Sequence, residues 1–144
     1  MMTSTLDKLD REFQAFPILR ASETPSEKKV AEAAMSLGVT FHEDYISFLQ
    51  RYGGAIVGSF PIFGLRPVKV MGDRWSVVDV TKWFRNEGWP GTHSWYIVSE
   101  DGFGNPIGVA ENGRIMLFDH DVGNEQIIAI DFEHFLMECC LASL

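Results

Sequence analysis

Apolar residues in the first fifteen positions recur at helical spacing. Leu6, Leu9 and Phe13 lie three and four positions apart, which places them on one face of a helix. The step from Phe16 to Pro17 should end this helix, because a residue before proline avoids the helical conformation. The pattern therefore predicts a short N-terminal helix.

Capping signals predict two further helices. Thr24 and Glu27 match a capping box, and Pro25 stands at the expected first helical position. Thr40 and Glu43 repeat the capping-box match. Glycines predict both helix ends, and apolar residues form one face of each helix. The first face is Val30, Ala33, Ala34 and Leu37 before Gly38; the second is Tyr45, Phe48, Leu49 and Tyr52 before Gly53-Gly54.

The pattern then becomes strand-like and later ambiguous. Residues 55–65 combine apolar residues with Gly and Pro breaks, which is typical of short strands. In residues 76–87, Val77, Val80 and Phe84 have helical spacing, whereas the many β-branched residues favour a strand. We favour the helix, because the spacing spans two turns and Gly88 could end it.

Residues 95–130 have the pattern of an antiparallel meander. Asn112-Gly113 predicts a two-residue hairpin turn in which both residues are left-handed. Arg114–Phe118 is apolar on both faces, so this strand should lie inside the sheet, covered by helices on at least one side. From Asp131 onward, helical spacing returns and predicts a C-terminal helix. The predicted strands are Trp95–Ser99, Ile107–Glu111, Arg114–Phe118 and Gln126–Ile130.

These elements predict an α+β fold with a central antiparallel β-meander packed with N-terminal helices and a C-terminal helix. We expect one domain over residues 1–144, with 1–23 as an N-terminal helix and lead-in. Hydrophobic residues make up 46% and charged residues 22% of the 144, which excludes a disordered, collagen-like or disulfide-framework chain. No apolar run is long enough to cross a bilayer, and the charged N-terminus does not resemble a signal peptide. The expected compartment is the cytoplasm.

Charge is unevenly distributed along the chain. The formal net charge is −8, which argues against a general binder of nucleic acid or anionic membranes. Residues 1–85 hold eleven Lys or Arg and ten Asp or Glu, whereas residues 86–144 hold ten acids and a single base, Arg114. One face should therefore carry a negative field, which either serves solubility or steers a basic partner.

Candidate chemical groups are few. Cys139 and Cys140 fall on the apolar stripe of the last helix, where buried thiols pack as inert small hydrophobes. Asp119-His120-Asp121 could suggest a metal or acid/base site, but a strand would place the two carboxylates on one face and the imidazole on the other. No additional ligands, nucleotide loop or nucleophile signature accompany them. We expect no catalytic residue, no metal and no cofactor.

Several short blocks follow one another in a defined order. They are Leu37-Gly38, Tyr45 to Gly54, Phe63-Gly64, Ser99 to Asn105, Asn112-Gly113, Asp119 to Asp121, and Phe132 with Phe135-Leu136. In this order and spacing they resemble the SMI1/KNR4 (SUKH) superfamily from about Thr24 to the C-terminus. Phe41-His42 and Tyr52 differ from residues that the family often has there. The resemblance implies an α+β domain without catalysis, and many bacterial members look to be immunity proteins that bind and block a cognate polymorphic toxin, commonly a nuclease. Because toxin-binding residues vary among members, it implies no particular site residue.

The function we expect is therefore stoichiometric binding of a protein toxin with a basic surface, without direct contact to nucleic acid or membrane. The expected binding surface is the acidic rim of the meander, with Trp89 as an anchor because it stands in a turn beside Pro90-Gly91. Its residues are Trp89, Glu100, Asp101, Glu111, Asp119, Asp121 and Glu125. Two alternatives stay open: a regulatory or scaffold module of the same fold, and a small-ligand or metal-dependent hydrolase that uses Asp119, His120 and Asp121.

Overall fold

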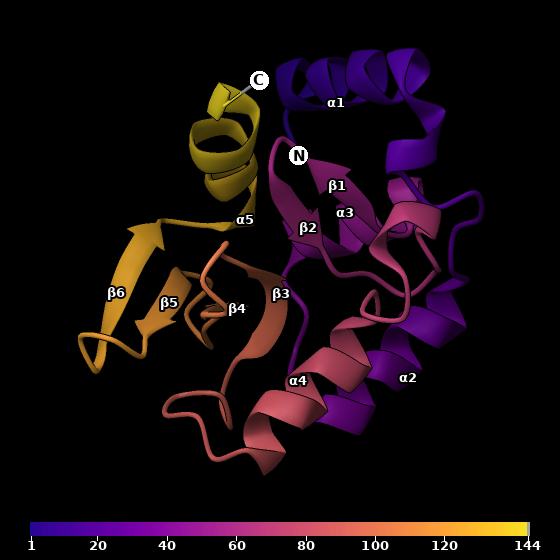
Figure 1. Cartoon of the computed structure of the whole chain (residues 1–144). Helices are drawn as coiled ribbons and strands as arrows, with labels where there is room; N and C mark the ends of the chain where they lie inside the picture. The colour runs from indigo at the N-terminus through magenta and orange to yellow at the C-terminus, as the bar shows by residue number, and fades with distance from the viewer. Residues whose placement is uncertain (144) are drawn as a thin grey trace.

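The computed structural model describes residues 1–143, in which helices pack around two antiparallel sheets (Figure 1). This arrangement confirms the predicted α+β fold and its meander. The helices are α1 (Thr3–Ala15), α2 (Glu27–Leu37), α3 (Glu43–Tyr52), α4 (Val77–Asn86) and α5 (Phe132–His134). The strands are β1 (Ala55–Val57), β2 (Phe60–Ile62), β3 (Tyr96–Glu100), β4 (Pro106–Val109), β5 (Ile115–Asp119) and β6 (Asn124–Ala129). Short 3-10 turns cover Pro17–Leu19, Lys69–Met71 and Leu141–Ser143.

Helices α2 and α3 begin later than their capping signals predicted. Ser26, not Thr24, caps α2, since its Oγ accepts a hydrogen bond from the backbone N–H of Lys29 at 3.2 Å. The N-cap residue of α3 is His42, and no side chain caps that helix, so Thr40 does not act as predicted. Both glycine-terminated ends are confirmed, because Gly38 and Gly53 are left-handed.

The ambiguous segment 76–87 forms helix α4, as we favoured. Ser76 caps it through a hydrogen bond from Asp79 N–H at 3.4 Å. Arg85 then donates hydrogen bonds to the carbonyls of Leu37, Thr92 and Trp95, at 2.8, 2.8 and 2.9 Å. One guanidinium therefore joins α4 to the end of α2 and to the start of β3.

The larger sheet has the order β3-β4-β5-β6, with every neighbouring pair antiparallel, so the prediction that Arg114–Phe118 lies inside the sheet is confirmed. The small β1-β2 hairpin joins the outer edge of β3 through a hydrogen bond from Phe63 N–H to Val98 O, 2.8 Å long. Val98 is the residue that a β-bulge leaves out of the β3–β4 register.

The β4–β5 connection differs from the predicted two-residue turn. Gly113 is left-handed, with φ +88°, but Asn112 is not. Gly113 N–H donates to Ala110 O at 2.8 Å, and Ala110 N–H donates to Arg114 O at 2.9 Å. These bonds are typical of a three-residue loop in which only the last residue needs a positive φ, so Asn112 avoids the strained conformation.

Both faces of the larger sheet are covered along β3 and β4, whose residues are almost all buried. Tyr96 of β3 packs on Tyr45 of α3, and Tyr45 also contacts Phe132 of α5, with ring centroids 5.2 and 5.1 Å apart. On the other face Trp95 lies over Gly108, where a Cβ atom would come within 2.9 Å of the indole ring. Buried side chains of α1 belong to the same apolar cluster as the sheet. The division into one domain stays a prediction.

The C-terminal helix is less regular than predicted. After the three residues of α5, Phe135–Cys140 continues as a π-helix, which apolar spacing at i+3 and i+4 does not reveal. Cys140 is fully buried, as predicted, and Cys139 is half-buried. Burial raises the pKa of both thiols, in agreement with packing rather than nucleophilic roles. Within residues 1–143, no helix is long and apolar enough to cross a bilayer.

Candidate functional site

The meander separates the predicted acidic residues into two groups. Successive connections of an antiparallel sheet lie at alternate ends, so the β3–β4 and β5–β6 loops share one end and the β4–β5 loop lies at the other. Five of the predicted acids are at the first end, whereas Glu111 is at the second. Those five are Glu100, Asp101, Asp119, Asp121 and Glu125.

Side-chain hydrogen bonds hold the two loops of the first end. Asp101 Oδ1 accepts from the backbone N–H groups of Phe103 and Asn105, each at 2.9 Å, and Asp101 Oδ2 accepts from the Asn105 amide at 2.8 Å. Asn105 Oδ1 in turn accepts from the backbone N–H of His120 at 3.1 Å and contacts the His120 ring. Asn105, which is buried, therefore ties the β3–β4 loop to the β5–β6 loop.

The β5–β6 turn is ordered by Asp119. Its Oδ1 accepts from the N–H groups of Asp121 and Val122, at 2.9 and 3.3 Å. Because Asp119 ends β5 and a turn follows, the strand alternation predicted for Asp119, His120 and Asp121 is wrong. No group of three or more His, Cys, Asp or Glu in the described part of the chain could hold a metal ion.

Two exposed apolar side chains lie at the tips of these loops, and sequence reasoning missed both. Phe103 is 80% exposed and Val122 is 64% exposed. Each is an apolar residue next to glycine in a polar loop, which was the available signal. We call this end the tip surface and define it by Asp101, Phe103, Asp119, Asp121, Val122 and Glu125. It combines apolar side chains with carboxylates.

Trp89 and Glu100 are less exposed to a binding partner than Phe103 and Val122 of the tip surface. The indole of Trp89 is half-buried and packs edge-on against Phe84, Phe118 and His120, with centroids 5.2, 6.0 and 5.8 Å away. The side chain of Glu100 is 18% exposed and forms an ion pair with Arg74. Burial raises the pKa of Glu100, and Arg74 opposes this rise. Neither residue is therefore part of the tip surface.

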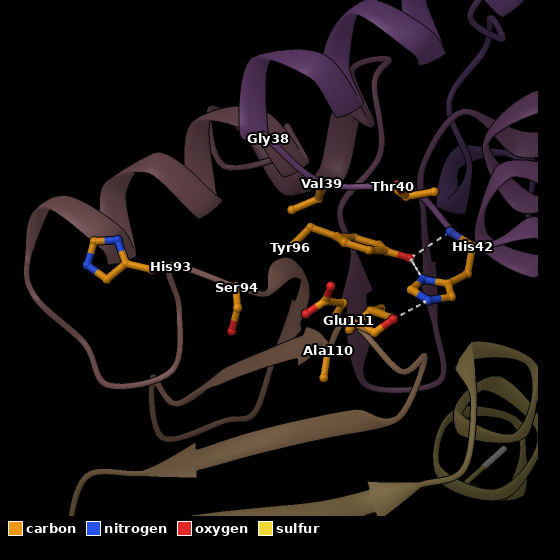
Figure 2. A pocket seen from close by; sticks show the side chains of 10 residues that line it. Gly38, Val39, Thr40, His42, His93, Ser94, Tyr96, Ala110 and Glu111 are labelled. Carbon is orange, nitrogen blue, oxygen red and sulfur yellow. Dashed lines mark hydrogen bonds between the residues drawn. The ribbon is translucent and has the colours of Figure 1, made fainter.

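Glu111 borders a cavity of about 320 Å³ at the opposite end of the sheet, shown in Figure 2. His42 lines this cavity and contacts two other lining residues. The phenolic oxygen of Tyr96 accepts a hydrogen bond from the backbone N–H of His42 at 3.0 Å and lies 2.8 Å from His42 Nδ1. His42 Nε2 lies 3.1 Å from the carbonyl oxygen of Glu111. Since a carbonyl oxygen only accepts, Nε2 carries the proton and Nδ1 accepts from the phenol. Burial raises the pKa of Tyr96, which keeps that phenol protonated. Both imidazole nitrogens of His42 are thus hydrogen-bonded within the fold, and they connect the start of α3 to the β4–β5 loop.

Comparisons with known proteins agree with this fold. The sequence profile of the SMI1/KNR4 family (SUKH-1) matches residues 24–138. No curated protein matches the sequence. Eighteen chains of solved structures match the fold. One is the crystal structure of a protein from Pseudomonas syringae pv. tomato, with a TM-score of 0.75 and 16% identity over 99% of this chain and 100% of that one. On the strength of the profile match and the shared fold, the chain belongs to the SMI1/KNR4 family (SUKH-1).

Proposed function

We propose that this protein is an immunity protein that binds a cognate toxin stoichiometrically and blocks it without catalysis. Its family includes immunity proteins. The observation that carries the proposal is the tip surface, where Phe103 and Val122 are exposed among carboxylates. Exposed aromatic side chains serve as interface anchors, and surrounding charges select the partner and speed its approach.

The charge of the tip surface indicates the kind of toxin. Four of its six defining residues, Asp101, Asp119, Asp121 and Glu125, are acids and none is Lys or Arg, so the field at this end is negative. A toxin that cleaves nucleic acid needs a basic cleft, and an acidic inhibitor competes for that cleft and associates quickly. We therefore propose a cytoplasmic complex in which Asp121 and Glu125 face basic residues of the toxin.

The loop conformations favour tight binding. Asp101, Asn105 and Asp119 hold the loops through side-chain bonds to backbone N–H groups. Loops that are already ordered lose little conformational entropy when a partner binds. Glu111 takes no part in this surface, because it lies at the other end of the sheet.

Co-expression tests the proposal. Toxin domains encoded beside this gene are expressed with and without the protein, and growth rescue and a co-purified complex are measured. Rescue accompanied by a stable complex would support the immunity function. A complex with a neighbour that is not toxic would favour the regulatory or scaffold alternative.

A matched pair of variants then locates the interface. Phe103 and Met35 are each 80% exposed, but Met35 lies on α2, outside the tip surface. Phe103→Ala should weaken toxin binding roughly fivefold to thirtyfold, as expected for an anchor worth about 1–2 kcal/mol. Met35→Ala should leave the dissociation constant unchanged. Equal constants for both variants would contradict the assigned surface.

A further inference from the structure

Strand β6 leaves one edge of the larger sheet open. Among residues 1–143 it pairs only with β5, whereas the opposite edge, β3, is joined by the β1-β2 hairpin through Phe63. Figure 1 shows β6 at the outer margin of the sheet, with no element drawn beyond it. Residues Asn124–Ile127 are all exposed. Since N–H and C=O groups alternate in direction along a strand, half of those in β6 point away from β5.

Of the features that usually protect an open edge, this run has only a charged side chain, Glu125. Edge strands are commonly shielded by lysine, proline or a bulge. Residues 124–127 contain neither lysine nor proline. The only bulge in the β5–β6 register follows them at Ile128, between the pairs Met116↔Ile127 and Ile115↔Ala129. Ile127 is 62% exposed, so an apolar β-branched side chain stands beside unpaired backbone groups.

The side chains of this run specify what could pair with it. Glu125 lies opposite Phe118 and Ile127 lies opposite Met116, so both point to the same face of the sheet. A strand added outside β6 would place two of its residues, two positions apart, next to that carboxylate and that isoleucine. Opposite charges and β-branched contacts stabilise such cross-strand pairs. The matching sequence is a Lys or Arg two positions from a Val or Ile.

Charge distinguishes a foreign segment from a second copy of this chain. Residues 86–144, which include β6, have one base and ten acids, and Asp121 precedes the strand. Pairing two β6 strands would bring two such regions together, which like-charge repulsion disfavours. A basic segment gains from the same field.

We propose that β6 binds an extended, basic segment of a partner protein by adding it as a fifth strand to the sheet. The inference rests on the proposed function only for the identity of the protein that carries the segment. Main-chain hydrogen bonds provide the affinity, and Glu125 and Ile127 provide the sequence preference.

A peptide titration followed by NMR tests this inference without the toxin. The probe is a blocked heptapeptide, Thr-Arg-Thr-Val-Thr-Arg-Thr, in which Arg and Val are two positions apart in either direction. Its addition to the ¹⁵N-labelled protein should shift the amide signals of Asn124–Ile127 and slow their hydrogen exchange. The same peptide N-methylated at its three central residues, or with Glu for Arg, should shift them little or not at all.

Two protein variants complete the test. Ile127→Lys should weaken peptide binding roughly twofold to fivefold, the range expected from one lost cross-strand pair. Ile130→Lys is the matched control, because Ile130 is 56% exposed and follows the strand; it should bind as the wild type does. Circular dichroism melts verify that both variants fold.

Three results would overturn the inference. Peptide-induced shifts confined to other elements would place the binding elsewhere. Equal binding of the N-methylated peptide would exclude strand addition, and a homodimer that Ile127→Lys dissociates would replace the basic segment with a second copy. None of these results bears on toxin rescue, so the proposed function and this inference can fail separately.

Discussion

Replacing Gly64 with alanine tests the close approach of two glycine-containing turns. A Cβ atom on Gly64 would lie 2.6 Å from the carbonyl carbon of Gly53 and 2.8 Å from Gly54 Cα, and closer still to Gly53 O. All three are backbone atoms, so no side-chain rotation relieves the overlap. Since carbon atoms normally approach to about 3.5–4.0 Å, the two turns would have to separate by roughly 1 Å.

The structure sets the magnitude of the effect. Gly53 O accepts hydrogen bonds from the N–H groups of Leu65 and Arg66, at 2.9 and 3.1 Å, and separation breaks both. Two backbone hydrogen bonds contribute roughly 1 kcal/mol each, and overpacking adds roughly 1–3 kcal/mol. We therefore expect Gly64→Ala to lower the free energy of unfolding by about 3–5 kcal/mol, a large part of the roughly 5–15 kcal/mol typical of a domain.

Urea denaturation followed by circular dichroism measures this loss. Gly102→Ala is the control, because a Cβ atom on Gly102 meets nothing within 4 Å and its φ is not left-handed. That variant should stay within about 1 kcal/mol of the wild type. If Gly64→Ala also unfolds within about 1 kcal/mol of the wild type, with an unchanged m-value, the packing argument is refuted.

Three further predictions concern binding, pH and metals. The double variant Asp121→Lys/Glu125→Lys should slow association with the toxin and flatten the salt dependence of the association rate, whereas Glu111→Lys, at the other end of the sheet, should do neither. Stopped-flow mixing at two ionic strengths measures the association rates. Equal effects of the two variants would refute the separation of the two ends. The hydrogen bond between His134 Nδ1 and Asp131, 2.7 Å long, raises the pKa of His134 above its ordinary value of 6.5. The stabilisation that this hydrogen bond gives is therefore complete below pH 6.5 and is lost as the pH rises through the raised pKa. His134→Gln should then destabilise the protein more at about pH 5.5 than at about pH 8.5. A difference in urea midpoints that does not change with pH would contradict this linkage. Magnesium, manganese and zinc ions should leave the melting temperature unchanged in a thermal-shift assay, whereas an increase would favour the metal-dependent hydrolase alternative.

Much of the fold could be predicted because the spacing of apolar residues along the chain indicates which side chains are buried. The apolar faces of α2, α3 and α4, and the interior position of β5, all follow from which residues must avoid water. Helix starts were less predictable, because Thr24 and Ser26 are chemically equivalent caps and only the path of the chain selects between them. A sequence motif gives residue types but not backbone φ angles. The pair Asn112-Gly113 therefore does not distinguish a two-residue turn from a three-residue loop.

The sequence indicates the carboxylates of the tip surface but not its exposed apolar side chains. The acidic rim expected from the sequence groups Glu111 with the other loop acids, although successive connections of an antiparallel meander lie at alternate ends of the sheet. The pairing of Glu100 with Arg74 joins positions 26 residues apart, which no local pattern reveals. Phe103 was overlooked because periodicity analysis assigns apolar residues to a core, and a loop has no period from which an exposed one would deviate.

At the tip surface, the residues that hold the loops in place differ from the residues that are exposed for binding. Asp101 and Asp119, together with the buried Asn105 beneath them, hold the loops through bonds to backbone N–H groups, whereas Phe103 and Val122 are exposed. Substitution at the exposed positions therefore removes no contact on which folding depends, and surface changes of this kind alter stability by only about 0.5 kcal/mol. A gene with this arrangement can change the specificity of its product by single mutations while the scaffold stays intact. Under the function proposed above, such a protein can acquire new toxin partners without first acquiring compensating mutations in its core.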